Sequence, residues 1–338
     1  MRIVRPAIFL AAIAAGALVL PATASHAAAA ASRHRDAAVQ VVASFDPAQG
    51  QNPENLAIAP DGTVYVTWLF AHSVAAIRPD GSQAVVTLRP GEASGIAIDP
   101  ARPGRLTVAL ISADPGTAGI WTIPLGAFHG DGAPARFVAL PTGAFPNGIT
   151  YAPDGTLYIA DSARGLILRV ARGASAAATW LSSGLLTPTG ATFDGVPLPG
   201  VNGLKVHDGQ LYATNTARGL LLRIPIQAGA AGAPVIARSG MAFDDFAISP
   251  GGVVSAALNI SDQVVRFSPA GPAVVIADKA HDGVENPSAV AFGAHHQLFI
   301  TSSAYFGSHP ALQVTEPPGP GMHSTASRTA RAAAEAGR

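Results

Sequence analysis

The chain repeats one pattern of apolar and polar positions six times. Each copy opens on a polar residue, continues with a short apolar run, makes a turn, and ends in a second apolar run. Alternating apolar positions over four to eight residues indicate half-buried strands. A repeat of 40 to 55 residues built from such strands is typical of a β-propeller with one four-stranded sheet per blade. The copies open at Glu54, Ser94, Asn147, Asn202, Asp244 and Ser288.

The third copy indicates how one blade is built. Its segments GITYA, TLYIAD, GLILRV and ATWLSS each have the length and the apolar content of a strand. The tetrapeptide APDG, which begins at Ala59 and again at Ala152, separates the first strand from the second. Pro at the second position and Gly at the last position favour a type I turn. We therefore expect a tight hairpin at the start of each blade.

The last copy is one strand short. It supplies NPSAVAF, QLFITS and PALQVTE, whereas the early segment VQVVASF at Val39 has no blade of its own. Pairing this segment with the last copy would close the ring and remove two exposed sheet edges. The sequence thus predicts an all-β fold over residues 39–316, a six-bladed β-propeller closed by an N-terminal strand in the last blade. A non-closed solenoid and a two-sheet sandwich are the alternatives.

The two ends of the chain differ from the repeats. Residues 1–27 have a basic start, an apolar run of about 14 residues and small residues around Ala24 and Ala27, which is typical of a cleaved secretory signal peptide. An uncleaved anchor is the alternative, although the run is shorter than the roughly 20 residues of a membrane span. We expect a flexible leader at 28–38, a disordered tail at 317–338, and a secreted protein without a membrane span when mature.

Composition narrows the function. The chain has no cysteine, which excludes a thiol nucleophile, a thiolate metal site and disulfides. Lys plus Arg equals Asp plus Glu at 21 each, so no overall field favours nucleic acid. No GxSxG elbow of a serine hydrolase occurs. A monomer that acts on a small molecule is therefore the expectation.

The polar residues that open the copies carry the candidate chemistry. In a propeller the first strand of each blade lines the central channel, so these positions should converge at one face. Glu54 and Asp244 would supply carboxylates, and Asn147 and Asn202 would supply amide oxygens. Oxygen ligands favour hard cations. Ca²⁺ is the first expectation, with Mg²⁺ or Mn²⁺ as alternatives; Zn²⁺ ranks last because no His or Cys joins the ring.

Other polar residues near these positions have structural explanations. Ser94 and Ser288 are expected to line the channel without binding the metal. Asp245 is expected to turn outward, because side chains alternate along a strand. Asp161 and Asn215 follow two second strands at equivalent places, where turn capping explains them.

The pattern resembles the regucalcin/gluconolactonase family of six-bladed propellers, also called the senescence marker protein family. The phrases FPNGITYAPDG and VNGLKVHDGQLYATN are in the style of that family, and the resemblance covers residues 39–316. It implies one divalent metal at the channel mouth, held by Glu54, Asn202 and Asp244, with Asn147 beside it.

The sequence departs from the sugar lactonases of this family at two places. Those proteins carry Gly-Pro after the first Glu, where this chain has Asn55 and Leu56. They also carry an Arg that contacts a polyhydroxylated substrate, where this chain has Phe145, and an Asp where it has Gly148. Phe145 in the substrate-binding position predicts a lactone or ester more apolar than gluconolactone.

The resulting expectation is a secreted, metal-dependent hydrolase of lactones or related cyclic esters. Asp244 would be both metal ligand and general base, and Asn147 would orient the substrate. A non-catalytic, metal-stabilised propeller that binds a ligand or partner is the main alternative. A third possibility is a different enzyme on the same scaffold, resembling the strictosidine-synthase or lyase-type propellers.

Overall fold

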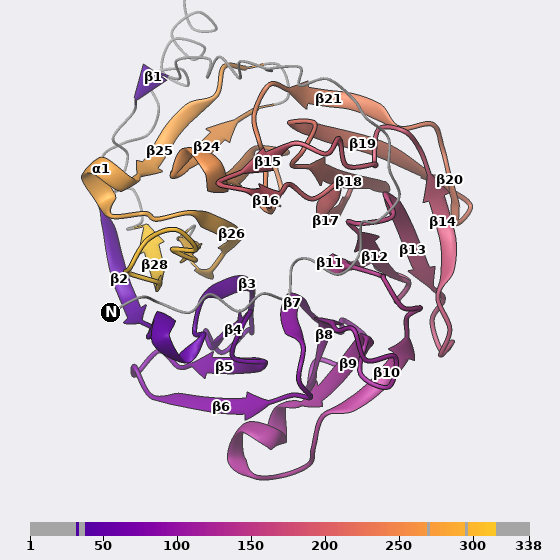
Figure 1. The fold of residues 1–338 in the computed structure, drawn as a ribbon, viewed down its shortest axis with the longest axis horizontal. Helices are drawn as coiled ribbons and strands as arrows, with labels where there is room; N and C mark the ends of the chain where they lie inside the picture. Colours follow the sequence, from indigo (N-terminus) through magenta and orange to yellow (C-terminus); the bar gives the residue numbers. More distant parts are fainter. Residues whose placement is uncertain (1–31, 34–37, 269–270, 295–296, 316–338) are drawn as a thin grey trace, which may run out of the picture.

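The computed structural model describes residues 32–33, 38–268, 271–294 and 297–315. Six sheets of four or five strands are arranged in a ring (Figure 1), and a two-stranded hairpin lies outside them. The predicted six-bladed β-propeller is confirmed. The expected signal peptide 1–27 and tail 317–338 lie outside the described residues. Of the expected leader 28–38, Ser32–Arg33 form β1, which pairs in parallel with Val274–Val275.

The first three blades are four-stranded antiparallel sheets. Blade 1 comprises β3 (Pro53–Ile58), β4 (Val64–Trp68), β5 (Ser73–Ile77) and β6 (Gln83–Thr87). Blade 2 comprises β7 (Glu92–Ile98), β8 (Arg105–Ile111), β9 (Gly119–Pro124) and β10 (Ala135–Ala139). Blade 3 comprises β11 (Pro146–Tyr151), β12 (Leu157–Asp161), β13 (Leu166–Val170) and β14 (Ala178–Ser182).

Blades 4 and 5 each carry a short additional strand, β20 (Ala230–Ala231) in blade 4 and β1 in blade 5. Blade 4 comprises β17 (Val201–His207), β18 (Gln210–Asn215), β19 (Leu220–Gln227) and β21 (Val235–Ser239), with β20 beside β19. Blade 5 comprises β22 (Phe246–Ile248), β23 (Val254–Leu258), β24 (Gln263–Phe267) and β25 (Val274–Asp278). The small hairpin of β15 (Thr192–Phe193) and β16 (Val196–Pro197) joins blade 3 to blade 4. The helix α1 (Lys279–Asp282) joins blade 5 to blade 6.

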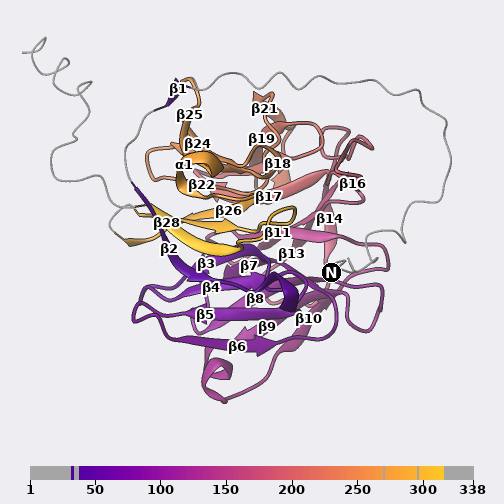
Figure 2. The ribbon, with the colours of Figure 1, turned by 60° about the vertical axis from the view of Figure 1, so that its left-hand side comes forward.

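The ring closes in blade 6 as the sequence predicts. Three strands come from the end of the chain, β26 (Pro287–Phe292), β27 (Leu298–Ser302) and β28 (Ala311–Thr315). The fourth is β2 (Val39–Ser44), which pairs antiparallel with β28. Figures 1 and 2 both show β2 alongside β28, so two distant segments of the chain complete one sheet. No helix among the described residues is long and apolar enough to cross a bilayer.

The blade-entry turns follow the predicted chemistry. The N–H of Gly62 donates to Ala59 O at 2.9 Å, and the N–H of Gly155 donates to Ala152 O at the same distance. Both bonds close a four-residue turn, and both glycines have φ of +85°. Glycine adopts this left-handed conformation without the steric cost that a Cβ would add.

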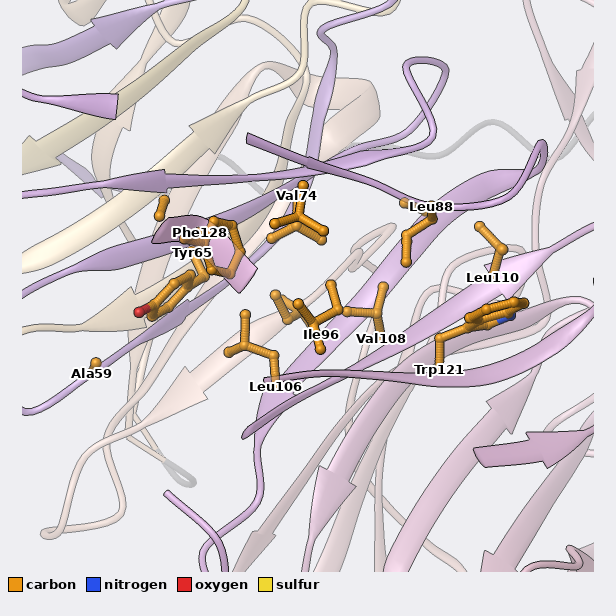
Figure 3. Packing of buried hydrophobic residues seen from close by; sticks show 14 residues of the cluster. Ala59, Tyr65, Val74, Leu88, Ile96, Leu106, Val108, Leu110, Trp121 and Phe128 are labelled. Carbon is orange, nitrogen blue, oxygen red and sulfur yellow. The ribbon is translucent and has the colours of Figure 1, made fainter. Parts of the chain in front are cut away.

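Apolar side chains fill the space between neighbouring blades. Figure 3 shows one such cluster, in which Val74 and Leu88 of blade 1 face Ile96 and Val108 of blade 2. Tyr65 of blade 1 packs against Phe128 of the β9–β10 connection at one side of this cluster. Their ring centroids are 5.2 Å apart. The alternation seen in the sequence thus reflects burial between blades.

Candidate active site at the channel mouth

Three glycines allow the first strands to converge on the channel. Gly95, Gly148 and Gly203 each follow a residue that opens a blade. A Cβ on Gly95 would lie 2.1 Å from Asn147 O, and one on Gly148 would lie 2.4 Å from Asn202 O. Any side chain there would collide with the neighbouring blade. The two Asn-Gly pairs are therefore positions of close strand approach, and the Asn side chains are brought to the same rim.

Hydroxyl groups join the first strands of successive blades. Ser94 Oγ donates to Pro146 O at 2.7 Å, and Ser288 Oγ donates to Pro53 O at 3.1 Å. From the second strand of blade 4, Thr214 Oγ1 donates to Asp244 O at 2.6 Å. Ser94 and Ser288 thus have a defined structural role in fixing the ring, which accounts for their type without a ligand.

Asp244 and Asn202 are in direct contact. Asn202 Nδ2 donates to Asp244 Oδ1 at 2.7 Å and to Thr216 Oγ1 at 3.0 Å. Thr216 is held in turn by its bond to Phe243 O at 2.7 Å. Because both amide hydrogens of Asn202 are used in this way, its carbonyl oxygen is the atom left to bind a ligand.

Burial raises the pKa of Asp244 to about 8, and the nearby negative charge of Asp245 acts in the same direction. The hydrogen bonds from Asn202 and Asn259 oppose this shift, because they favour the ionised carboxylate. A carboxyl with this pKa exchanges its proton near neutral pH. Such perturbed groups are concentrated at functional sites.

Glu54, at the start of blade 1, has a similar environment. Burial raises its pKa well above the usual range, and the charges of Asp244, Asp245 and Glu92 raise it further. Tyr305 Oη, from the β27–β28 connection, donates to Glu54 Oε2. The site thus holds two carboxyl groups that burial and mutual repulsion keep from ionising together.

Asn147 is buried, with 4 % of its surface exposed. Its side chain forms no hydrogen bond with any residue that the structure describes. Among the described residues the fully buried side-chain polar atoms without a partner are Trp68 Nε1 and Gln210 Oε1, so the Asn147 amide is open to water or to a ligand at the rim. Phe145, two residues earlier, is half-buried, and its backbone N–H donates to Asp161 Oδ1 at 3.2 Å.

The donor set suits a hard divalent cation. Two carboxyl groups and two amide oxygens are ligands that Ca²⁺ and Mg²⁺ accept. Among the described residues no three His, Cys, Asp or Glu side chains are grouped closely enough to hold a metal. A cation at this rim would therefore rely on Glu54 and Asp244 together with the two Asn amides. An opposite charge there would also lower the pKa of both carboxyls.

Asp245 differs from expectation. Rather than turning outward, it is buried with 3 % exposed, and Asn55 Nδ2 donates to its Oδ2 at 3.0 Å. Lys205 Nζ lies 2.7 Å from both of its carboxylate oxygens. A strand residue next to an inward one would normally face away. Here β22 begins only at Phe246, so Asp244 and Asp245 precede the regular alternation.

Asp161 and Asn215 cap turns, as their position suggests. Asp161 Oδ1 accepts from Arg164 N at 3.2 Å, and Arg164 Nε donates to Asp161 Oδ2 at 2.7 Å. Asn215 Oδ1 accepts from Arg218 N at 3.0 Å. Through these bonds, both side chains stabilise the turns that follow the second strands.

Two residues of the site are absent from the sequence-based prediction. Glu92 lies two residues before Ser94, just as Phe145 lies two residues before Asn147. An alignment of the six copies that began two residues earlier would have included Glu92. Burial raises its pKa to about 7. Tyr305 lies in a connection without a repeat counterpart, so no pattern in the sequence indicates its contact with Glu54.

Comparison with known proteins supports the fold. No family model and no curated protein matches the sequence, but solved structures do. A gluconolactonase from Xanthomonas campestris superposes with a TM-score of 0.64 at 19% identity, covering 85% of this chain and 92% of its own. A calcium-binding regucalcin from Agrobacterium tumefaciens gives 0.61 at 16% identity, with 82% and 93% covered.

A virginiamycin B lyase from Staphylococcus aureus is similar too, with a TM-score of 0.54, 15% identity, and 78% and 82% of the two chains covered. At these identities the likeness concerns the fold alone. The chain therefore has the architecture of the regucalcin and gluconolactonase propellers, and the resemblance seen in the sequence is confirmed at that level.

Proposed function

We propose that this chain is a secreted, divalent-metal-dependent hydrolase of lactones or related cyclic esters. One observation carries the proposal. At a single rim, Glu54 and Asp244 have pKa values raised by burial, and the buried amide of Asn147 beside them has no partner among the described residues. A cation would favour the ionised form of both carboxyls, and water or a polar ligand would complete the hydrogen bonding of the amide. The similarity to gluconolactonase and regucalcin folds supports the same assignment.

Glu54, Asp244, Asn202 and Asn147 would hold the cation. When bound, it would polarise the substrate carbonyl and stabilise the charge that develops on its oxygen. Ca²⁺ is the ion that we propose first, and we propose that the protein acts as a monomer.

Asp244 acts as general base on the attacking water. The water oxygen bonds to the carbonyl carbon while its proton passes to a carboxylate oxygen of Asp244. The ring C–O bond then breaks, and the departing alkoxide takes the proton back, which gives a hydroxy acid. Asn202 fixes the carboxylate through its 2.7 Å bond to Oδ1. Asn147 orients the substrate with its free amide.

Elemental analysis of the purified protein, followed by a pH-based screen of lactones with and without chelator, tests the proposal. Bound divalent metal and chelator-sensitive hydrolysis are the expected results. Restoring activity by adding Ca²⁺, Mg²⁺, Mn²⁺ or Zn²⁺ to the stripped protein identifies the ion. If the protein contains no metal and binds none, the proposal is wrong.

The same screen separates the main alternative. A protein that binds metal yet hydrolyses no lactone or ester would be a non-catalytic propeller in which the ion stabilises a ligand-binding channel.

A further inference from the structure

Four aromatic side chains lie in connections between the strands of the blades, and one of them contacts the candidate site; we call them the aromatic collar: Phe70, Tyr305, Phe193 and Phe306. They form two edge-to-face pairs. Phe70 and Tyr305 have ring centroids 6.2 Å apart, and Phe193 and Phe306 have centroids 5.3 Å apart. Phe306 is exposed over 38% of its surface. Tyr305 and Phe306 are consecutive in the β27–β28 connection, so this one segment contributes a ring to each pair.

The aromatic collar is joined directly to the candidate site. The Tyr305 hydroxyl donates to Glu54 Oε2, so the ring of Tyr305 lies next to the Glu54 carboxyl. Phe70 follows β4 in the same blade as Glu54. A substrate held by Glu54 would therefore lie next to the rings of Tyr305 and Phe70.

The β15–β16 hairpin presents Phe193 in a fixed position. Its central residues, Asp194 and Gly195, have φ of +48° and +79°, as a two-residue type I′ turn requires. Outside the strand pairs, Leu198 N donates to Ala191 O at 2.8 Å. In Figure 1 the hairpin projects toward the middle of the ring. It thus reaches from the blade 3–4 connection to a blade 6 residue, Phe306.

We propose that the aromatic collar binds an apolar alkyl or aryl substituent on the lactone or ester, while Glu54, Asp244 and the two Asn residues bind its carbonyl end. This inference rests on the proposed function. A partly exposed Phe pair is an unfavourable surface in water, and it gains free energy when an apolar group covers it. A polyhydroxylated lactone has no such apolar group, so the collar would stay exposed to water when that substrate is bound.

Two δ-lactones that share a ring provide the test. δ-Valerolactone has no substituent, and δ-decalactone carries a five-carbon alkyl chain on the same ring. One fully buried methylene is worth about fourfold, so a partly covered chain should raise kcat/KM by about ten- to a hundredfold. In the double variant Phe193→Ser/Phe306→Ser this ratio should fall by at least tenfold. Ile236→Ser, at a 48% exposed position on the outer strand β21, is the matched control and should keep the ratio.

A ratio within twofold of one, or a higher kcat/KM for glucono-δ-lactone than for δ-decalactone, would overturn the inference and leave the proposed hydrolase intact. If no lactone is hydrolysed, binding decides instead. Calorimetry with δ-valerolactam and its 6-pentyl derivative, which resist hydrolysis, should give at least tenfold tighter binding of the alkylated compound. That preference should be lost in the double variant. Equal binding of the two lactams would overturn the inference independently of catalysis. Circular dichroism and thermal unfolding confirm that the variants are folded.

Discussion

Lys205 Nζ lies 2.7 Å from each carboxylate oxygen of Asp245, inside the ring of first strands. Asn55 Nδ2, from blade 1, donates to the same carboxylate at 3.0 Å. Lys205 also stands 5.5 Å from the ring centroid of Phe246. The charge of Asp245 is therefore balanced within the protein. Among the residues that the structure describes, Glu54 and Asp244 have no such cationic side chain beside them, and they are the two carboxyls that an added cation would neutralise.

Replacing Lys205 by Met should destabilise the protein by about 2 to 3 kcal/mol. Breaking a fully buried pair costs about 3 to 5 kcal/mol, and the cost is smaller here because 29% of the Lys205 side chain is exposed. Urea unfolding of the metal-free protein measures the change. Lys205→Met/Asp245→Asn should recover part of the loss, since neither charge is then left alone. Additive losses in this double-mutant cycle would mean that the pair does not couple.

Asp244→Asn should lower kcat for lactone hydrolysis by about 10² to 10⁴, the usual contribution of a general base. The amide keeps the size of the side chain but accepts no proton from water. The thermal midpoint should not fall, because the substitution removes a carboxyl that burial disfavours. Asp208→Asn, whose side chain is 85% exposed in a turn, is the control and should retain wild-type kcat. Wild-type turnover by Asp244→Asn would disprove the assigned role.

Gly148→Ala should destabilise the propeller by about 1 to 3 kcal/mol, the range for overpacking a tight site. The added methyl would lie 2.4 Å from Asn202 O and 2.9 Å from Gly203 Cα, both backbone atoms. It should also weaken cation binding, because it pushes Asn147 and Asn202 apart. Urea unfolding and calorimetric titration with Ca²⁺ measure the two effects. Gly184→Ala, where a methyl would meet no atom within 4 Å, is the matched control.

The six-fold repeat is the feature of the sequence from which most of the fold could be predicted. Blade number, ring closure by β2 and the rim positions follow from apolar alternation with a regular spacing, because each blade must bury the same faces. The alignment also brought Glu54, Asn147, Asn202 and Asp244 to one rim. Their role as metal ligands stays a prediction.

Contacts between connections could not be predicted in this way. Phe193 and Phe306 meet although 113 residues separate them, and Tyr305 reaches Glu54 across the junction of blades 6 and 1. These residues lie outside the repeat, so nothing in the period relates one to another. Asp245 was misjudged for a different reason. Strand alternation applies only where a strand is regular, and β22 begins one residue later.

Glu92 predicts how stability depends on pH. Burial raises the pKa of this carboxyl from 4.5 to about 7, so between these values the folded protein holds a proton that the unfolded chain has released. The free energy of unfolding must then decrease as pH rises from about 4.5 to 7. Above pH 7 the full destabilisation by the ionised Glu92 carboxylate is present. At 1.36 kcal/mol per pKa unit, Glu92→Gln should be more stable than wild type by up to about 3 kcal/mol at pH 8. The two proteins should match at pH 4.

Glu285→Gln is the contrasting variant for this measurement. Burial acts to raise the pKa of Glu285, but the N–H groups of Ser308 and His309 and the ammonium of Lys279 lower it overall. Its carboxylate therefore stabilises the fold above the unfolded pKa, and the Gln variant should lose stability there. Urea unfolding of the metal-free proteins at half-unit steps from pH 4 to 8 gives all three curves. If the Glu92→Gln curve ran parallel to wild type, Glu92 would not be a buried carboxyl at the channel mouth, and its repulsion of Glu54 would have to be discarded with it.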